Sequence, residues 1–282
     1  MHITKGFAEV ENSKLYYEMA GEGHPLLLVH PMLTSHQYWD DQFGEFAKQY
    51  RVIRYDVRGF GQSKISKEAF SDTQDIVQLL DCLGIEKTYI LGLSMGGEIA
   101  MQFVLEHPER VDGLVMSGVG LEGYEYSVEG TQEFEPKWMA FIERIQNHDF
   151  AGARERFIEF AVDSPVGRAD EKVRERAREL MQDYTFPHFF PPDDVVASAE
   201  ATSAESQEAH VPIIQRLKEI QVPTLVMAGG YEAKDIQNIV DVLVRDIPHA
   251  QKAVISKAGH FVSLEKPVEF NRVVLNFLDK LG

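Results

Sequence analysis

The sequence predicts an α/β protein with a mostly parallel, eight-stranded sheet, helices on both faces of the sheet and one inserted helical segment. Three observations support this fold class: short apolar runs recur along the chain, amphipathic stretches separate most of them, and the alternation stops between residues 120 and 211. Strands that are buried on both faces have continuous apolar runs of this kind. We expect such strands at residues 25–30, 51–55, 88–91, 111–117, 224–228 and 252–255.

Two further strands are expected at the start of the chain, where residues 7–10 and 15–19 flank the turn-forming triplet Glu11-Asn12-Ser13 and predict a β-hairpin. Residues 235–247 illustrate the helices, because their apolar side chains recur at helical spacing and form one stripe. The C-terminal helix repeats this pattern. The two stripes are Ile236, Ile239, Val240, Leu243 and Ile247, followed by Phe270, Val274, Phe277 and Leu281.

Residues 120–211 predict a helical cap inserted into the α/β core, which then consists of residues 1–119 and 212–282. The aromatic segment 186–192 ends the helical run. We expect most of its aromatic side chains to form the core of the cap, and the rest to line a pocket. The predicted helical stripes are Trp138, Phe141, Ile142 and Ile145; Phe150, Ala153, Phe157 and Phe160; and Val173, Ala177, Leu180, Met181 and Tyr184.

Charge excludes two classes of partner. The chain has 28 Lys and Arg against 45 Asp and Glu, a formal net charge of -17. Such a surface repels the phosphates of nucleic acids and anionic lipids, so neither nucleic acid nor membrane is an expected partner. No apolar run approaches the roughly 20 residues needed to span a bilayer. The sequence carries no signal that specifies an oligomeric state.

Cysteine usage and the N-terminus indicate a cytoplasmic protein. Cys82 is the only cysteine, so an intramolecular disulfide is impossible. Residues 1–6 lack the basic start and apolar stretch of a secretory signal. His, Cys and carboxylate residues show no metal-ligand spacing, and we expect neither a metal nor another cofactor.

A serine motif carries the strongest chemical signal. Gly92-Leu93-Ser94-Met95-Gly96 follows a predicted strand and opens a predicted helix, which is the context of a nucleophile elbow. Glycine is expected at positions 92 and 96 because side chains there would collide with the neighbouring strand and helix. A phosphate-binding loop and a dinucleotide fingerprint are excluded, since the segment has neither a Gly-Lys-Ser/Thr ending nor G-x-G-x-x-G spacing.

Three motifs taken together resemble the α/β-hydrolase superfamily. They are the elbow at Ser94, the turn Asp56-Val57-Arg58-Gly59-Phe60-Gly61-Gln62-Ser63, and Gly259-His260 near the C-terminus. Within that superfamily the chain is similar to small bacterial carboxylesterases, enol-lactonases and cofactor-free haloperoxidases. The resemblance implies an α/β-hydrolase fold with a helical cap after the sixth strand. It also implies that the turn carrying Asp56 and Arg58 is structural.

His260 is the predicted base for Ser94. A serine hydroxyl is a weak nucleophile until a base accepts its proton, and histidine is the usual base. His260 follows the last predicted strand, so it lies at the carboxyl edge of the sheet, where Ser94 also emerges. We therefore expect the two side chains to meet.

Two backbone N–H groups are candidates for an oxyanion hole, which stabilises the negative charge that develops on the carbonyl oxygen. Met95, directly after the nucleophile, supplies the first. The resemblance implies that the loop His30-Pro31-Met32-Leu33 supplies the second from Met32. Pro31 replaces the family's usual glycine and stiffens the loop. We expect His30 to support this loop rather than to carry protons.

Glu232 is the predicted triad acid, with Asp235 as the alternative. In related hydrolases the acid follows the penultimate strand, and the family's Gly-Asp-x-Asp pattern reads Gly-Gly-Tyr-Glu here, which places Glu232 at the aspartate position. Asp235 begins an amphipathic helix, and a capping role would explain its presence. The extra methylene of glutamate displaces the carboxylate unless the loop adjusts.

These residues predict a serine esterase of the carboxylesterase type. We expect Ser94, His260 and Glu232 to cleave a small carboxylic ester or lactone through an acyl-enzyme. The alternatives are carbon–carbon bond hydrolysis or acyl transfer by the same triad, and a catalytically weak ligand-binding member of the fold. Fold analogy alone does not name the substrate.

Overall fold

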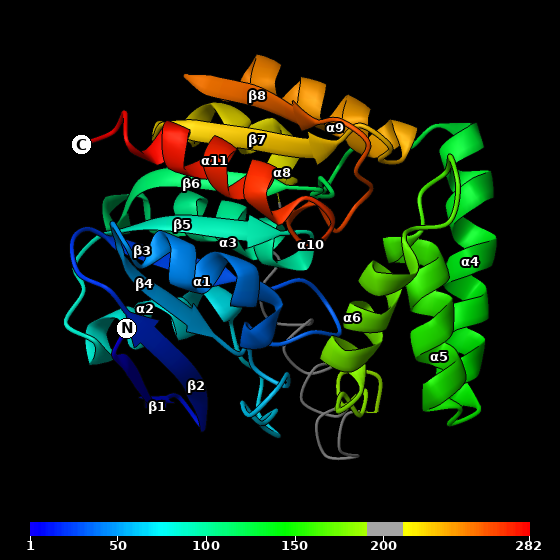
Figure 1. Ribbon diagram of the computed structural model, residues 1–282, viewed down its shortest axis with the longest axis horizontal. Helices are drawn as coiled ribbons and strands as arrows, with labels where there is room; N and C mark the ends of the chain where they lie inside the picture. Colours follow the sequence, from blue (N-terminus) through cyan, green and yellow to red (C-terminus); the bar gives the residue numbers. More distant parts are fainter. Residues whose placement is uncertain (191–210) are drawn as a thin grey trace.

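The computed structural model describes residues 1–190 and 211–282, and it contains one eight-stranded sheet in the order β1-β2-β4-β3-β5-β6-β7-β8 (Figure 1). All eight predicted strands are present. Their bounds are β1 Ile3–Val10, β2 Ser13–Ala20, β3 Pro25–Val29, β4 Arg51–Tyr55, β5 Thr88–Leu93, β6 Val111–Ser117, β7 Thr224–Gly229 and β8 Ala250–Ile255.

The strands from β4 to β8 in the sheet order pair parallel, whereas β1 and β2 form an antiparallel hairpin and β2 also pairs antiparallel with β4. The central strands explain why apolar runs predicted them. Every residue of β5 and β7 is buried, because helices cover both faces of the sheet. Because these strands run parallel, the carboxyl ends of β5, β7 and β8 lie at the same edge of the sheet.

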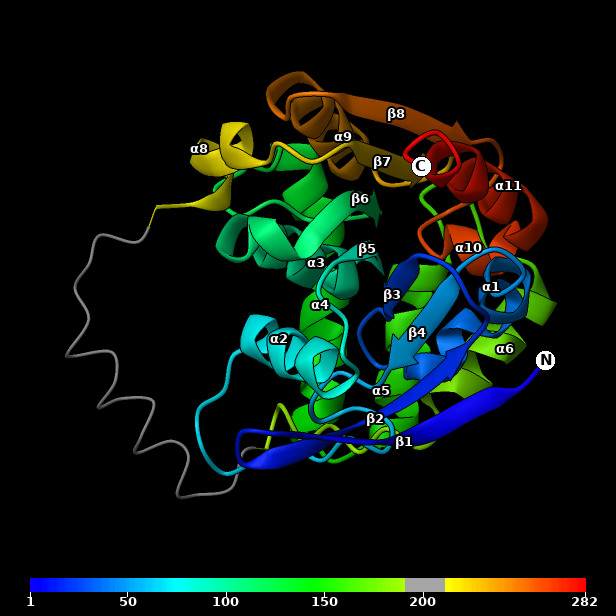
Figure 2. The same cartoon turned by 90° about the vertical axis from the view of Figure 1, so that its left-hand side faces the viewer.

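Helices cover the two faces unequally (Figure 2). Helix α1 (Asp40–Phe46) packs against α11 (Pro267–Leu278) on one face. On the opposite face, α2 (Asp72–Cys82) packs against α3 (Met95–Glu106), and α9 (Lys234–Asp246) packs on β7 and β8. The predicted stripes face inward, since Ile239, Val240 and Leu243 of α9 and Phe270, Val274 and Phe277 of α11 are buried. Two short helices complete the core, α8 (Ile213–Arg216) and α10 (Val262–Glu265).

The described residues between β6 and β7 form helices joined by loops, and no strand occurs among them. This segment contains α4 (Val128–Gln146), α5 (Phe150–Phe157), a π-helical turn (Ile158–Val162) and α6 (Glu171–Met181). These helices lie beyond the carboxyl ends of the parallel strands (Figure 1). Residues 191–210, which belong to the predicted insertion, lie outside the described part of the chain.

The helices of this segment share an aromatic core. Phe141 of α4, Phe157 of α5 and Phe186 are buried, and the rings of Phe141 and Phe157 lie 5.5 Å apart. Phe186 packs against Phe141 at 6.2 Å, whereas Phe190 is 39% exposed. Aromatic side chains of the 186–190 stretch thus join the core of the segment, as predicted, while the prolines at 191 and 192 lie outside the described residues.

His188 joins this segment to the core. Its Nε2–H donates to the carbonyl of Arg58 at 3.0 Å, and its Nδ1 accepts from the Tyr184 hydroxyl at 2.7 Å. The ring also stacks on Phe60, with centroids 4.5 Å apart. The glycine-rich turn after β4 therefore contacts the helical segment near His188.

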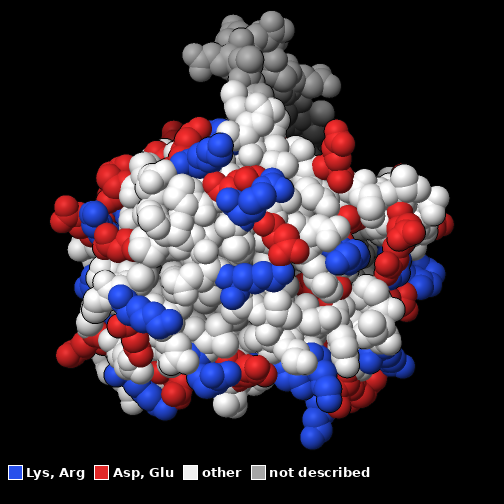
Figure 3. Space-filling model, turned by 90° about the horizontal axis from the view of Figure 1, so that it is seen from above, with Lys and Arg blue, Asp and Glu red and all other residues white. Residues whose placement is uncertain are grey.

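Figure 3 shows mixed charge on one face of the molecule. On the face shown in Figure 3, acidic and basic side chains alternate over the surface and no extended basic area is visible. Among the described helices, none has both the length and the apolar character that crossing a bilayer requires.

Candidate active site

Ser94 occupies the sharp turn between β5 and α3. Its backbone has φ 53° and ψ -125°, a left-handed conformation that non-glycine residues rarely adopt. Its N–H donates to the carbonyl of Ser117 at 2.8 Å, which ties the turn to the end of β6. Strain of this kind persists only where the surrounding structure enforces it. A strand, a strained serine and a helix therefore follow one another here, which is the local structure that a nucleophile elbow requires.

The glycines around Ser94 make room for this turn. A Cβ added at Gly92 would overlap the carbonyl of Gly96, and a Cβ added at Gly96 would overlap the carbonyl of Val29 in β3. Any side chain at either position would force two backbone segments apart. The steric reason given for both glycines in the sequence is thus confirmed.

Met95 and Met32, the two predicted oxyanion donors, lie just beyond the ends of β5 and β3. Met95 is the first residue of α3, so its N–H has no partner within the helix. Met32 lies in the turn after β3, which closes through a hydrogen bond from Thr34 Oγ1 to the carbonyl of Pro31 at 2.7 Å. The next residue, Leu33, has φ 63°. Both side chains are partly buried.

His30 supports this turn, as expected. Its Nδ1–H donates to the carbonyl of Pro31 at 2.9 Å, and its Nε2 accepts from the N–H of Val57 at 3.0 Å. Complete burial lowers the pKa of His30 to about 4, so the ring stays neutral. With both nitrogens engaged, His30 holds the loops after β3 and β4 together.

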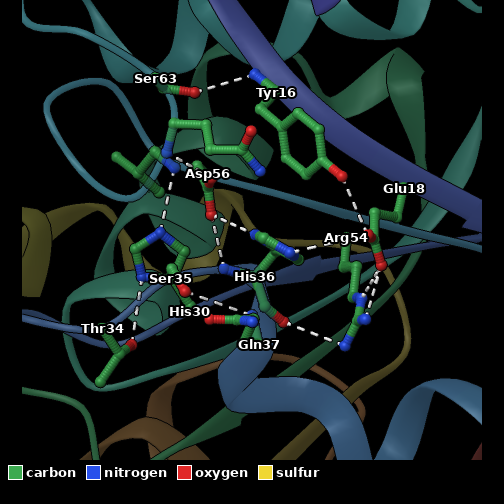
Figure 4. Close-up of polar contacts among 12 residues, drawn as sticks. Tyr16, Glu18, His30, Thr34, Ser35, His36, Gln37, Arg54, Asp56 and Ser63 are labelled. Carbon is green, nitrogen blue, oxygen red and sulfur yellow. Dashed lines mark hydrogen bonds and ion pairs between the residues drawn. The ribbon is translucent and has the colours of Figure 1, made fainter. Parts of the chain in front are cut away.

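Asp56, which is labelled in Figure 4, and Arg58 also have structural partners. The Asp56 carboxylate is fully buried and accepts from the backbone N–H of His36 at 2.7 Å and from that of Gln62 at 2.8 Å. It also contacts Nδ1 of His36 at 2.7 Å. Arg58 forms a buried ion pair with Asp75. The turn after β4 is therefore structural, as the resemblance implies.

Glu232 and His260 face each other across two loops. Nδ1 of His260 lies 3.1 Å from both carboxylate oxygens of Glu232. Glu232 is buried, and the His260 side chain is 18% exposed. A carboxylate can only accept, so Nδ1 carries the proton and Nε2 is left as the ring's acceptor. This tautomer can take a proton from a serine hydroxyl.

The carboxylates around His260 alter its acidity. Burial lowers the pKa of the imidazole, but the charge and hydrogen bond of Glu232 oppose burial, with smaller contributions from Glu98 and Glu265. The net effect raises the pKa of His260 above its ordinary value of 6.5.

The loops that carry Glu232 and His260 are joined through their backbones. The N–H of Gly230 donates to Ile255 and that of Tyr231 to Ala258, each at 2.8 Å. A Cβ at Gly229 would overlap the carbonyl of Gly259. These backbone contacts hold the two loops together, and in this arrangement the glutamate carboxylate contacts the ring.

Gly118 connects the Ser94 turn to the pair of His260 and Glu232. This residue was not identified from the sequence. The residue follows β6 with φ +58°, and a Cβ there would lie 2.9 Å from His260 Nδ1 and 3.3 Å from Glu232 Oε2. Its neighbour Ser117 accepts the N–H of Ser94. Across the described residues, no hydrogen bond links the Ser94 hydroxyl to His260; such bonds are often long before substrate binds. The available signal was a glycine directly after β6, a strand that ends at the same edge of the sheet as β5, β7 and β8.

Asp235, the alternative acid, makes no contact with His260. Its Oδ2 accepts from both the N–H and the hydroxyl of Ser127, at 3.1 and 2.9 Å, and its Oδ1 from Tyr124 at 3.4 Å. The expectation that Asp235 caps its helix was wrong, since the N-cap is Ala233 and has no side-chain bond. Through its bonds with Ser127, the N-cap of α4, Asp235 links the start of α4 to α9.

Within the part of the chain that is described, no three His, Cys, Asp or Glu side chains gather as a metal site.

Comparison with known proteins gives one consistent result. A family model described as the alpha/beta hydrolase fold matches residues 24–267. A 2-hydroxy-6-oxo-6-phenylhexa-2,4-dienoate hydrolase of Comamonas testosteroni is 27% identical over 98% of this chain and 96% of its own. A carboxylesterase of Bacillus subtilis (strain 168) is 28% identical over 90% of this chain and 79% of its own. The structure of an N-acyl homoserine lactone degrading enzyme is 30% identical, covers 96% of this chain and 100% of its own, and has a TM-score of 0.74.

Proposed function

The chain belongs to the α/β-hydrolase fold family, and from this premise we propose that it is a serine hydrolase that cleaves a small carboxylic ester or lactone through an acyl-enzyme. The observation that carries the proposal is the meeting of three loops. The strained Ser94 turn is hydrogen-bonded to Ser117, and a Cβ at the next residue, Gly118, would lie within 3.3 Å of both His260 and Glu232. The similarity to a carboxylesterase and to a lactone-degrading enzyme supports the substrate class.

In the proposed reaction, Nε2 of His260 removes the proton of Ser94 while the serine oxygen attacks the carbonyl carbon. Glu232 keeps Nδ1 protonated and stabilises the imidazolium that forms. The backbone N–H groups of Met32 and Met95 bind the oxyanion. His260 then protonates the leaving alcohol, and the neutral ring activates a water that hydrolyses the acyl-enzyme. No metal or other cofactor takes part.

We propose that residues 120–211 form a cap over this site and that residues 1–119 and 212–282 form the core. The helices α4, α5 and α6 lie beyond the strand ends from which Ser94, Glu232 and His260 emerge (Figure 1). A cap in this place would set substrate size more than the chemical step. We also propose a cytoplasmic location, since the single Cys82 makes an intramolecular disulfide impossible.

The second candidate function is cleavage of a carbon–carbon bond by the same residues. It is favoured by the relative from Comamonas testosteroni, which is named for an unsaturated keto acid rather than an ester. Acyl transfer and weak ligand binding are the remaining alternatives.

A substrate panel tests the proposal. Purified protein is assayed against p-nitrophenyl esters of increasing acyl length, simple lactones, and a vinylogous keto acid, with Ser94→Ala as the control. Ester or lactone turnover, together with an acyl adduct on Ser94 in intact-mass and peptide analysis, is the expected result. Turnover of the keto acid alone would favour the second candidate, and ester turnover that survives in Ser94→Ala would refute the serine mechanism.

A further inference from the structure

We propose that Glu265 is a positioning residue for His260, holding the histidine loop by its backbone while Glu232 holds the ring. The inference rests on the proposed function, because it assigns Glu265 a role in presenting the base of that reaction.

The contact is between a carboxylate and the residue before the histidine. Both oxygens of Glu265 accept the N–H of Gly259, at 2.9 and 3.0 Å. Glu265 closes the short helix α10, and its own N–H donates to the carbonyl of Phe261 at 3.0 Å. The chain thus folds back on itself, and the carboxylate anchors the peptide that leads into His260.

The backbone of the histidine loop at Gly259 is closely packed on two sides. A Cβ added at Gly259 would lie 3.1 Å from Glu265 Oε1 and 3.4 Å from Ser164 of the inserted segment. On the other side, the carbonyl of Gly259 approaches Gly229 of the loop that carries Glu232. Glu265 therefore holds the backbone of the histidine loop at Gly259, whereas Glu232 contacts the ring of His260.

The negative charge of Glu265 also affects the pKa of His260. Three carboxylates, those of Glu232, Glu98 and Glu265, act on His260 and oppose the effect of burial on its pKa. Removing the charge of Glu265 should therefore make the imidazolium less stable and lower the pKa of His260. Only the neutral ring can accept the serine proton, so activity should then persist to lower pH.

Charged groups of both signs surround Glu265. The carboxylate lines a cavity of about 180 Å³ between the histidine loop and the inserted segment, together with Arg168, Asp170, Tyr231, Lys257 and Lys266. Burial raises the pKa of Glu265; the Gly259 N–H opposes this, Glu232 adds to it, and His260 and Lys266 counteract it. Tyr231, which precedes Glu232, also lines this cavity.

Two substitutions separate position from charge. Glu265→Gln keeps an oxygen that can accept from Gly259 but removes the charge. Glu265→Ala removes both and leaves the Gly259 N–H without its partner. Glu269→Gln is the matched control, because the Glu269 side chain is 43% exposed and pairs with Arg272 instead of the histidine loop.

The test combines kinetics with a titration that needs no turnover. In Glu265→Ala, kcat should fall about tenfold or more, since small displacements of a catalytic group are costly. In Glu265→Gln, kcat on the pH plateau should stay within about threefold while the acid limb of kcat/KM moves to lower pH. The NMR signals of the His260 ring are assigned by their absence in His260→Gln. They should titrate at lower pH in Glu265→Gln than in the unsubstituted protein, and at an unchanged pH in Glu269→Gln.

An unchanged His260 titration in Glu265→Gln would overturn the inference, as would a kcat in Glu265→Ala equal to that of the unsubstituted protein. If Glu265→Ala fails to fold, the titration of Glu265→Gln decides alone. If Ser94→Ala remains fully active, the proposed function fails, whereas the NMR result still decides the role of Glu265.

Discussion

The carboxylate of Glu232 faces Nδ1 of His260 with both oxygens at the same distance, 3.1 Å. The ring is therefore held by a symmetric acceptor, and the N–H can point to either oxygen. Gln237 fixes the backbone of the acid, because its Nε2 donates to the carbonyl of Glu232 at 2.8 Å. The glutamate is thus supported in place even though the family pattern has aspartate at this position.

Glu232→Gln should lower kcat by about a hundredfold or more with little change in KM. The amide removes the charge that stabilises the imidazolium and can favour the wrong ring tautomer. Glu232→Asp keeps the charge but retracts it, and about 1 Å of displacement can cost on the order of a hundredfold. Steady-state kinetics of both variants measures the effect. Full activity of Glu232→Gln would exclude Glu232 as the acid.

Ser94→Ala and His260→Ala should each reduce kcat by several orders of magnitude, and the double variant should be no slower than the worse single one. A nucleophile and its base act as a unit, so their losses do not add. Rates for the three variants, with circular dichroism to show that each is folded, test this. Additive losses would indicate that the two residues act independently.

The pH dependence of kcat/KM should show an acid limb with its midpoint above 6.5, the ordinary histidine value. The carboxylates near His260 raise its pKa, and activity requires the neutral ring, so activity is lost as pH falls through that raised value. A pH–rate profile with a p-nitrophenyl ester measures the midpoint. A profile that stays flat from pH 5 to 9, with chemistry rate-limiting, would contradict a histidine base.

Gly118→Ala should lower kcat by about a hundredfold, because its methyl group would lie 2.9 Å from His260 Nδ1 and displace the ring. Gly84→Ala is the matched control. Gly84 also has a positive φ, +64°, but a methyl group there meets no atom within 4 Å. Both variants should lose roughly 1 kcal/mol or more of stability from backbone strain, and only Gly118→Ala should lose turnover. Equal activities of the two variants would show that Gly118 does not confine the ring.

Asp235→Ala should lower the free energy of unfolding by about 2 kcal/mol or more, since the buried carboxylate accepts two hydrogen bonds from Ser127. Asp235→Asn keeps one acceptor oxygen and should lose less. Chemical denaturation measures both variants. If Asp235→Asn were instead folded but inactive while Glu232→Gln kept its rate, Asp235 rather than Glu232 would be the acid.

Local signals in the sequence predicted the sheet and the elbow well. The strands are short apolar runs bounded by turns, and the elbow depends on contacts that Gly92 and Gly96 make close to the serine. The role of Asp235 was assigned wrongly because its partner, Ser127, is 108 residues away, whereas a carboxylate at the start of a helix resembles a cap. Gly118 was missed for a related reason, since only the folded sheet places it against His260.

The pairing of β6 with β7 determines when the site can exist during synthesis. Ser117 pairs with Met227 across the whole helical segment, and Gly118 donates its N–H to the same Met227. Contacts between such distant positions carry a large loop-closure cost and form slowly. A nascent chain that ends before β7 already contains the serine turn but has neither Glu232 nor His260. The proposed reaction therefore requires that the last strands have joined the sheet, because the unfinished polypeptide lacks both the proposed base and the proposed acid.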